Sequence, residues 1–257
     1  MPERQLRKEI WINTLRVCLP IALLSVLVCV FLAQLSAQQS RTQFKEKLAL
    51  LSDSIQIRMV GLLHEPLSDV TFLRSMPALQ AYVDSPTEKN NHALAMYLLG
   101  FSRSREVYDQ VRYIDADGLE QIRIDLDAQG NARMIPKAEL QNKRHRYYFT
   151  NTAQLSDGEC YVSPLDLNVE RGDIERPFKP MIRFGMPIRN QAGQLQGIIL
   201  LNYLAGEVLS SFDQAVQKSS NDVFLLNHEG YYLYGGALNQ RWGFRFPARS
   251  QYTLQKQ

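Results

Sequence analysis

The sequence predicts an α+β protein that begins with one transmembrane helix. An uncharged apolar stretch fills residues 17–36, an apolar stripe of helical period follows in residues 37–65, and two-residue alternation starts at residue 107. The 257 residues are 45% hydrophobic and 21% charged, which suits a folded domain with a core. The net charge of +3 is small and gives no indication of a nucleic-acid partner.

Residues 17–36 contain no acidic or basic side chain. As a helix they would extend about 30 Å, the thickness of the hydrocarbon layer of a membrane. Arg4, Arg7, Lys8 and Arg16 precede this stretch, so we expect the N-terminus in the cytoplasm and the rest of the chain in the periplasm, outside an inner membrane. A cleaved signal peptide is the alternative, but no good cleavage site of small residues follows.

The stripe in residues 37–65 predicts a long helix continuing out of the membrane. Its members are Phe44, Leu48, Leu51, Ile55, Met59 and Leu62. The stripe is narrow enough to form a homodimer seam, and packing on its own domain is the alternative. We expect Pro66 to end or kink this helix, and two further helices to follow over residues 67–83 and 88–102.

Alternating residues predict an antiparallel sheet with helices on its apolar side. Residues 107–114 and 119–126 form a hairpin around the turn at 115–118, and both strands have one apolar and one polar face. A strand follows at residues 181–188. The nearly all-apolar strand at 195–203 is expected in the centre of the sheet. Beyond it we expect a helix at 205–218 and a hairpin formed by 222–227 and 231–234.

Polar residues that indicate a binding site concentrate in residues 161–187. Arg183 interrupts an apolar strand and shares the polar face with Arg112 if the strands pair in register. Two arginines next to Tyr161 and Asp166 suit a small carboxylate or a zwitterion such as an amino acid, and an amine is a further candidate ligand. In the alternative interpretation Arg183 pairs with Asp166 or Glu170 and only holds the loop.

Residues 140–150 combine cations with aromatic rings. They are interpreted either as a surface loop or as a lid whose tyrosines close over a ligand while Arg146 meets its negative charge. The full set of expected ligand-binding residues is Arg112, Arg146, Tyr148, Tyr161, Ser163, Asp166 and Arg183.

The sequence gives no motif for catalysis or metal binding. Cys160 has no His or Cys companions and is expected to be a small buried residue, and His145 is expected at the surface. We therefore expect neither an enzyme nor a metal or cofactor site in these residues.

Four segments resemble the double Cache family, the PAS-like extracytoplasmic sensor modules of bacterial diguanylate cyclases, histidine kinases and chemoreceptors. They are YDQVRYIDADGLEQIRID (108–125), LQNKRHRYYF (140–149), YVSPLDLNVERGDIERPFKPMIRFGMPI (161–188) and GQLQGIILLNY (193–203). The resemblance implies that a membrane-distal lobe binds the ligand and that a membrane-proximal lobe relays the signal. The second lobe is incomplete here.

The resemblance implies the following organisation: a cytoplasmic N-terminus (1–16), a transmembrane helix (17–36), helices (37–105), a ligand-binding lobe (106–204), a connecting helix (205–219) and a truncated second lobe (220–257). It implies a sensor whose cytoplasmic output module, a diguanylate cyclase or a histidine kinase, is missing from these residues. A membrane-anchored adaptor that binds another periplasmic protein is the alternative.

Overall fold

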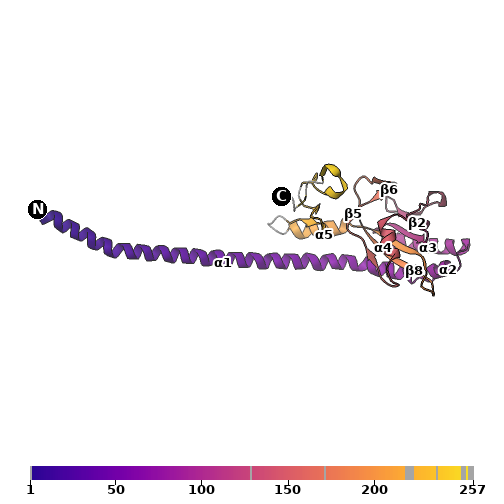
Figure 1. Cartoon of the computed structure of the whole chain (residues 1–257), viewed down its shortest axis with the longest axis horizontal. Coiled ribbons are helices and arrows are strands. Elements are labelled where there is room, and N and C mark those ends of the chain that lie inside the picture. Colours follow the sequence, from indigo (N-terminus) through magenta and orange to yellow (C-terminus); the bar gives the residue numbers. More distant parts are fainter. Residues whose placement is uncertain are drawn as a thin grey trace. The chain divides into compact units, whose positions relative to one another are not determined.

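The computed structural model describes residues 2–127, 129–170, 172–217, 223–235, 237–249 and 253. The chain divides into two compact units, Met1–Gln56 and Ile57–Gln257. The first unit is the N-terminal part of helix α1, whereas the second contains the sheet and the other helices (Figure 1). Helices together with an antiparallel sheet confirm the predicted α+β class.

Helix α1 spans Pro2–Arg74 and is, within the described residues, the one helix long and apolar enough to cross a membrane. Of the two effects predicted for Pro66, an end of the helix is wrong, since α1 continues to Arg74, and a kink stays a prediction. Met59 before the proline and Leu73 after it pack against the same core of the second unit. This shared packing explains why one lost backbone hydrogen bond does not end the helix.

Helices α2 (Pro77–Asp84) and α3 (Glu88–Arg105) follow. The helix predicted over 67–83 is therefore divided between the end of α1 and α2, because Pro77 favours the first position of a new helix. Helix α3 begins where predicted. The Thr87 hydroxyl caps it by accepting the N–H of Asn90 at 3.3 Å.

The sheet is built on four long strands: β1 (Tyr108–Asp115), β2 (Glu120–Leu126), β8 (Pro180–Arg189) and β9 (Leu195–Leu204). Its order is β3-β2-β1-β9-β8-β4, and β5 also pairs with β8. Strand β9 lies between β1 and β8, which confirms its predicted central place. The short strands are β3 (Ala132–Met134), β4 (Tyr161–Val162), β5 (Asp166–Leu167) and the hairpin β6 (Val169–Glu170) with β7 (Asp173–Ile174).

The turn between β1 and β2 depends on Gly118. This residue has a φ of +84°, and a Cβ atom there would lie 2.6 Å from the Arg144 backbone. Its carbonyl accepts the N–H of Lys143 at 2.6 Å. The turn thus holds the start of the basic, aromatic segment against the edge of the hairpin.

Strand β1 contains a β-bulge at Asp109. Tyr108 pairs with Tyr203 and Gln110 with Asn202, so β1 uses one more residue than β9 over this step. Tyr108 consequently packs in the apolar core, whereas Asp109 and Gln110 both face the opposite side of the sheet.

Both faces of the sheet are covered. Side chains such as Val111, Phe184 and Leu201 form the main core with α1, α2 and α3. On the other face, helix α4 (Tyr147–Ala153) packs against β8 and β9 and buries Tyr148 and Phe149 against β-strand side chains. Helices on the apolar side were predicted, and the second covering layer was not.

The C-terminal part contains α5 (Gly206–Gln217) and a hairpin of β10 (Leu225–Leu226) with β11 (Tyr232–Tyr234). The helix and the hairpin confirm the predictions, although Lys218 and Asp222 at their predicted bounds lie outside the described residues. Leu233 and Trp242 pack against Leu167 of β5. Three short 3₁₀ helices complete the described structure: η1 (Lys137–Glu139), η2 (Gly243–Arg245) and η3 (Pro247–Arg249).

Candidate functional site

Arg112 of β1 and Arg183 of β8 lie on the same face of the sheet, as predicted. Gln110 is opposite Asn202 and Asn202 is opposite Arg183, so these side chains project to one side of three neighbouring strands. Arg112 and Arg183 each have an exposed fraction of 2%. The polar face is therefore an interior surface, and its charged groups need partners inside the protein.

The ring of Tyr148 collects three guanidinium groups. The Cζ atoms of Arg112, Arg183 and Arg146 lie 5.2, 5.3 and 5.7 Å from its centroid. Arg112 Nη1 also donates to the Tyr148 hydroxyl at 3.3 Å. Burial raises the pKa of Tyr148, but the charges of Arg112 and Lys143 outweigh it, so the pKa lies below its ordinary value. The electron-rich face of the ring attracts these cations, so the ring holds three positive charges close together.

Arg112 begins a chain of hydrogen bonds across the sheet. Its Nη1 atom is 3.3 Å from Glu120 Oε1, and its Nη2 atom donates to Asn202 Oδ1 at 2.7 Å. Asn202 Nδ2 then donates to Gln110 Oε1 at 3.0 Å. The Nε atom of Arg112 has no hydrogen-bond partner among the described residues. The chain ends at Gln110, whose position is thereby fixed.

Arg183 begins a second chain. It donates to the Tyr147 hydroxyl at 3.0 Å and to Asn168 Oδ1 at 3.2 Å, and Asn168 Nδ2 donates to Glu175 Oε2 at 2.8 Å. Burial lowers the pKa of Arg183. The alternative interpretation of Arg183 is wrong, because Asp166 pairs with Arg245 and Glu170 with Arg123. Arg183 instead holds uncharged oxygen atoms.

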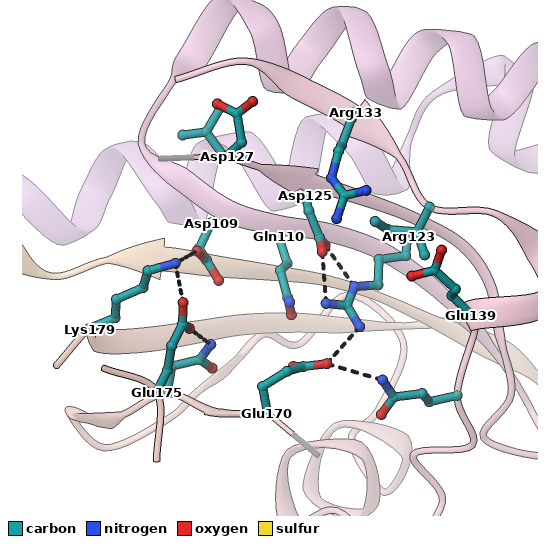
Figure 2. A pocket seen from close by; sticks show the side chains of 14 residues that line it. Asp109, Gln110, Arg123, Asp125, Asp127, Arg133, Glu139, Glu170, Glu175 and Lys179 are labelled. Atoms are coloured by element: carbon teal, nitrogen blue, oxygen red, sulfur yellow. Dashed lines mark hydrogen bonds and ion pairs between the residues drawn. The ribbon is translucent and has the colours of Figure 1, made fainter. Parts of the chain in front are cut away.

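Both chains end at the wall of a cavity of about 500 Å³ (Figure 2). Gln110 and Asn168 belong to its lining, as do Arg123 and Glu170. This volume is within the range of small-molecule pockets. Arg112 and Arg183 do not line the cavity themselves, but through these hydrogen bonds they orient the amide groups of Gln110 and Asn168, which do.

The charged groups of the cavity wall form two clusters. Arg123 binds Asp125 through Nε and Nη2, at 2.7 and 2.8 Å, and it reaches Glu170 at 3.1 Å through Nη1. Burial raises the pKa of Glu170, but Arg123 and Lys143 outweigh this and hold it below its ordinary value. The second cluster joins Lys179 to Asp109 and Glu175. Figure 2 shows the Lys179 cluster at the left of the view and the Arg123 cluster to its right, with Gln110 between them.

The remaining predicted residues lie nearby but differ in role. The Ser163 hydroxyl accepts the backbone N–H of Arg183 at 2.8 Å. The Tyr161 hydroxyl accepts from Asn151 Nδ2 at 3.3 Å. Asp166 forms an ion pair with Arg245 of η2. None of the predicted ligand-binding residues is among the described lining of the cavity, so their direct contact with a ligand stays a prediction.

Residues 147–150 of the predicted lid belong to helix α4. Tyr148 is buried and contacts both Arg112 and Arg183, Tyr147 contacts Arg183, and His145 is exposed as expected. The interpretation of residues 140–150 as a surface loop whose rings only fill the domain edge is therefore wrong for Tyr148. Closure over a ligand stays a prediction.

Sequence reasoning missed the charged residues of the cavity wall. Asp109 was hidden because the alternation of β1 gives no sign of a bulge. Lys179 lies in a proline-containing segment, and the Glu175–Lys179 spacing of four residues was the one available signal. Arg123 lies on the predicted polar face of its strand, but nothing in the sequence indicated that it is buried, with an exposed fraction of 6%.

The described residues contain no group of three or more His, Cys, Asp or Glu side chains that could hold a metal ion. Cys160 packs beside the main core, and burial raises the pKa of its thiol to about 11. A thiol with such a pKa is a poor nucleophile near neutral pH. The described lining of the cavity consists mainly of charged and amide groups, which can form ion pairs and hydrogen bonds with a small molecule.

The candidate site is thus a polar cavity beside an antiparallel sheet that has helices on both faces. Residues 59–257 match the model of the family described as "Bacterial histidine kinase, sensor domain". The chain belongs to this family, which points to a non-catalytic domain. No match was found among curated protein sequences.

Solved structures share this fold. The domain of a putative sensory box/GGDEF family protein from Vibrio parahaemolyticus has 22% identity and a TM-score of 0.67, covering 80% of this chain and 77% of its own. The extracellular domain of the putative histidine kinase vpHK1S-Z8 has 22% identity and a TM-score of 0.66, covering 80% and 73%. The ligand-binding domain of the Pseudomonas aeruginosa amino acid chemoreceptor PctC, in complex with GABA, has 18% identity and a TM-score of 0.51, covering 79% and 82%.

Proposed function

We propose that this chain is a membrane-anchored periplasmic sensor that binds a small molecule in the 500 Å³ cavity and signals to a cytoplasmic output module. The observation that carries the proposal is the convergence of two buried hydrogen-bond chains, led by Arg112 and Arg183, on amide groups at the cavity wall. Buried charges are costly unless they are paired or hydrogen-bonded, and here the hydrogen bonds of both arginines lead to amide groups that face an open volume.

Membrane anchoring rests on the apolar part of α1 and the basic residues before it. The helix contains a stretch suited to span a bilayer, and Arg4, Arg7 and Lys8 would hold its N-terminal end in the cytoplasm. The second unit then lies in the periplasm. We propose a diguanylate cyclase or a histidine kinase as the output module.

The ligand is a small amino acid, carboxylate or amine. The cavity wall contains both signs of charge together with amide groups, which suits a compound with its own charged ends. PctC, which shares the fold, is an amino acid chemoreceptor solved with GABA, and this supports the same ligand class here.

The signal would reach α1 through strand β1. Asp109 faces the cavity, and the adjacent Tyr108 donates its hydroxyl to Asp69 of α1 at 2.6 Å. A ligand that binds one position of β1 more tightly than another therefore shifts the position of α1.

A homodimer would carry this shift across the membrane. In the second unit Met59 and Leu62 pack against the core of their own domain. The C-terminal end of the predicted seam is therefore covered by the domain. Leu51 and Ile55 in the first unit remain the positions at which we propose that two copies meet. One helix then packs on its own domain near Met59 and Leu62 and pairs with a second copy near Leu51 and Ile55.

A thermal-shift screen of the full chain in detergent, with a panel of amino acids, carboxylates and amines, tests the proposal. At least one compound should raise the melting temperature of the wild type and fail to raise that of the Gln110→Ala/Asn168→Ala variant. Arg103→Ala, at an exposed position of α3, is the matched control and should respond as the wild type does. The proposal fails if no compound acts, or if the double variant responds normally.

A further inference from the structure

Lys179 places a primary ammonium group at the cavity, between two carboxylates. Its Nζ atom lies 3.0 Å from Asp109 Oδ1 and 2.6 Å from Glu175 Oε1 (Figure 2). All three residues belong to the cavity lining. The side chain of Asp109 is 7% exposed, whereas that of Lys179 is 32% exposed. The first carboxylate is thus fixed in the wall, and the ammonium group can leave toward water.

Carboxylates outnumber cations in the described lining. The acidic residues are Asp109, Asp125, Asp127, Glu139, Glu170 and Glu175, and the basic ones are Arg123, Arg133 and Lys179. Potentials add inside a low-dielectric cleft, so this lining favours a ligand that brings a positive group of its own.

Arg123 and Lys179 differ in how firmly they are held. The Arg123 guanidinium is bound in a fork by Asp125, reaches Glu170 as well, and its side chain is only 7% exposed. Lys179 is a compact point charge on a flexible stem with rotatable donors. Of these two cations, Lys179 is the one that another ammonium group can replace without breaking a planar fork.

We propose that Asp109 and Glu175 form the ammonium subsite of the ligand, and that Lys179 is its internal occupant, displaced by a ligand that carries a primary ammonium group. The inference rests on the proposed function of the cavity and narrows its ligand class to primary amines, including amino acids. Displacement exchanges one ammonium for another, so both carboxylates stay paired while Lys179 moves into water.

The protonation states fit this exchange. Burial lowers the pKa of Lys179, but its bonds to Glu175 and Asp109 outweigh burial and raise it, so the side chain is charged near neutral pH. Burial raises the pKa of Asp109, and Lys179 opposes that shift. A bare Asp109 carboxylate is therefore unfavourable, so a ligand that displaces Lys179 has to bring a cation of its own.

Displacement has a structural consequence. The Lys179 carbonyl accepts the backbone N–H of Asn168 at 2.9 Å, and Pro180, the next residue, begins β8. Release of the Lys179 side chain is therefore expected to shift the backbone at residues 179–180, where β5 pairs with β8. A ligand without an ammonium group would leave Lys179 in place and this segment unchanged.

Calorimetry of the full chain in lipid nanodiscs, with n-butylammonium and butyrate as probes, tests the proposal. The probes share a four-carbon chain and differ in the charged group. Lys179→Gln removes the competing ammonium and should raise the affinity for n-butylammonium roughly threefold to tenfold, the scale of a partly exposed ion pair. Its affinity for butyrate should not rise. Lys179→Arg keeps a competing cation and should bind n-butylammonium within about twofold of the wild type.

The second part of the test adds Asp109→Asn to Lys179→Gln. The double variant should bind n-butylammonium more weakly than Lys179→Gln alone, provided that the circular dichroism of both variants matches that of the wild type. The ammonium subsite is overturned if Lys179→Gln binds n-butylammonium no better than the wild type, or if neither protein binds it. Should carboxylates or neutral compounds still stabilise the wild type in that case, the cavity remains a ligand site and only the subsite fails. If no compound of any class stabilises the wild type, the proposed function fails as well.

Discussion

The Tyr108 hydroxyl donates to Asp69 Oδ2 at 2.6 Å, which joins the first residue of β1 to helix α1 inside the main core. Asp69 is 3% exposed, and Arg105 of α3 occupies its other oxygen at 2.6 Å. A strand, the long helix and a second helix therefore meet at one carboxylate. The next residue along the strand, Asp109, faces the cavity.

Tyr108→Phe should separate ligand binding from the response of α1. Removing the hydroxyl leaves one oxygen of a buried carboxylate unpaired, which costs about 1–3 kcal/mol. The melting temperature of the full chain should fall by several degrees. Because Asp109 and Gln110 are unchanged, the dissociation constant of a stabilising ligand should remain near that of the wild type. A large loss of affinity would show that Tyr108 serves the cavity directly.

Stability should also fall at high pH in the wild type and less so in Tyr108→Phe. Burial raises the pKa of Tyr108, and the hydrogen bond to Asp69 adds to this. A folded-state pKa above the unfolded value, about 10, means that the folded protein holds the proton more tightly. The stabilising contribution is complete below pH 10 and is lost as the pH rises toward the folded-state value. Melting temperatures measured between pH 8 and 11 check the difference.

Arg183→Ala and Asp166→Ala should both reduce the ligand-induced rise in melting temperature, by different routes. Arg183 holds Asn168 and Tyr147, so its loss frees an amide of the cavity wall. Asp166 pairs with Arg245, and its loss loosens the C-terminal segment against β5. Asp166→Ala should therefore respond like Arg245→Ala in the same assay, whereas Arg183→Ala should respond like Asn168→Ala. Unchanged ligand responses in both variants would remove these residues from the site.

Leu51→Lys and Ile55→Lys should weaken self-association of the full chain in detergent without lowering its melting temperature. Both positions lie in the first unit, outside the core of the sheet domain. Met59→Lys should instead destabilise the second unit, because Met59 packs against that core. Gln56→Lys, at an exposed position, is the matched control. Sedimentation velocity distinguishes the cases. Unchanged sedimentation of both Leu51→Lys and Ile55→Lys would exclude a dimer seam at these two positions.

Acid should destabilise the wild type more than Glu170→Gln. Burial raises the pKa of Glu170, but Arg123 and Lys143 hold it below its ordinary value. Its contribution is present above the unfolded value, about 4.3, and is lost as the pH falls through the folded-state value. Thermal melting between pH 3 and 7 should show the two proteins converging toward the acidic end. Parallel curves would mean that Arg123 does not stabilise the Glu170 carboxylate.

Local patterns were enough to predict most of the fold. Alternation located β1, β2 and β8, and a nearly all-apolar run located β9, because each pattern depends on a few neighbouring residues. Pro66 was misleading because its effect is outweighed by packing on both sides of it. That packing involves residues far away in sequence, which a local pattern does not contain.

The candidate site was predicted only in part, for the same reason. Register alone placed Arg112 and Arg183 on one face, and both lie there. Their burial depends on α4, which covers the face from above. Asp109 depends on a bulge, and Lys179 meets it across 70 positions of sequence. Pairs of this kind are set by the tertiary fold, so no spacing within the chain indicates them.

The bulge in β1 also makes this strand sensitive to length. Deleting Asp109 would restore regular pairing with β9, and Gln110 would then follow Tyr108 directly on opposite faces. The protein would keep its sheet and the hydrogen bond from Tyr108 to Asp69 of α1, but it would lose one of the two carboxylates of the ammonium subsite. A single codon deletion at this point would therefore be expected to yield a folded protein that no longer responds to ligand.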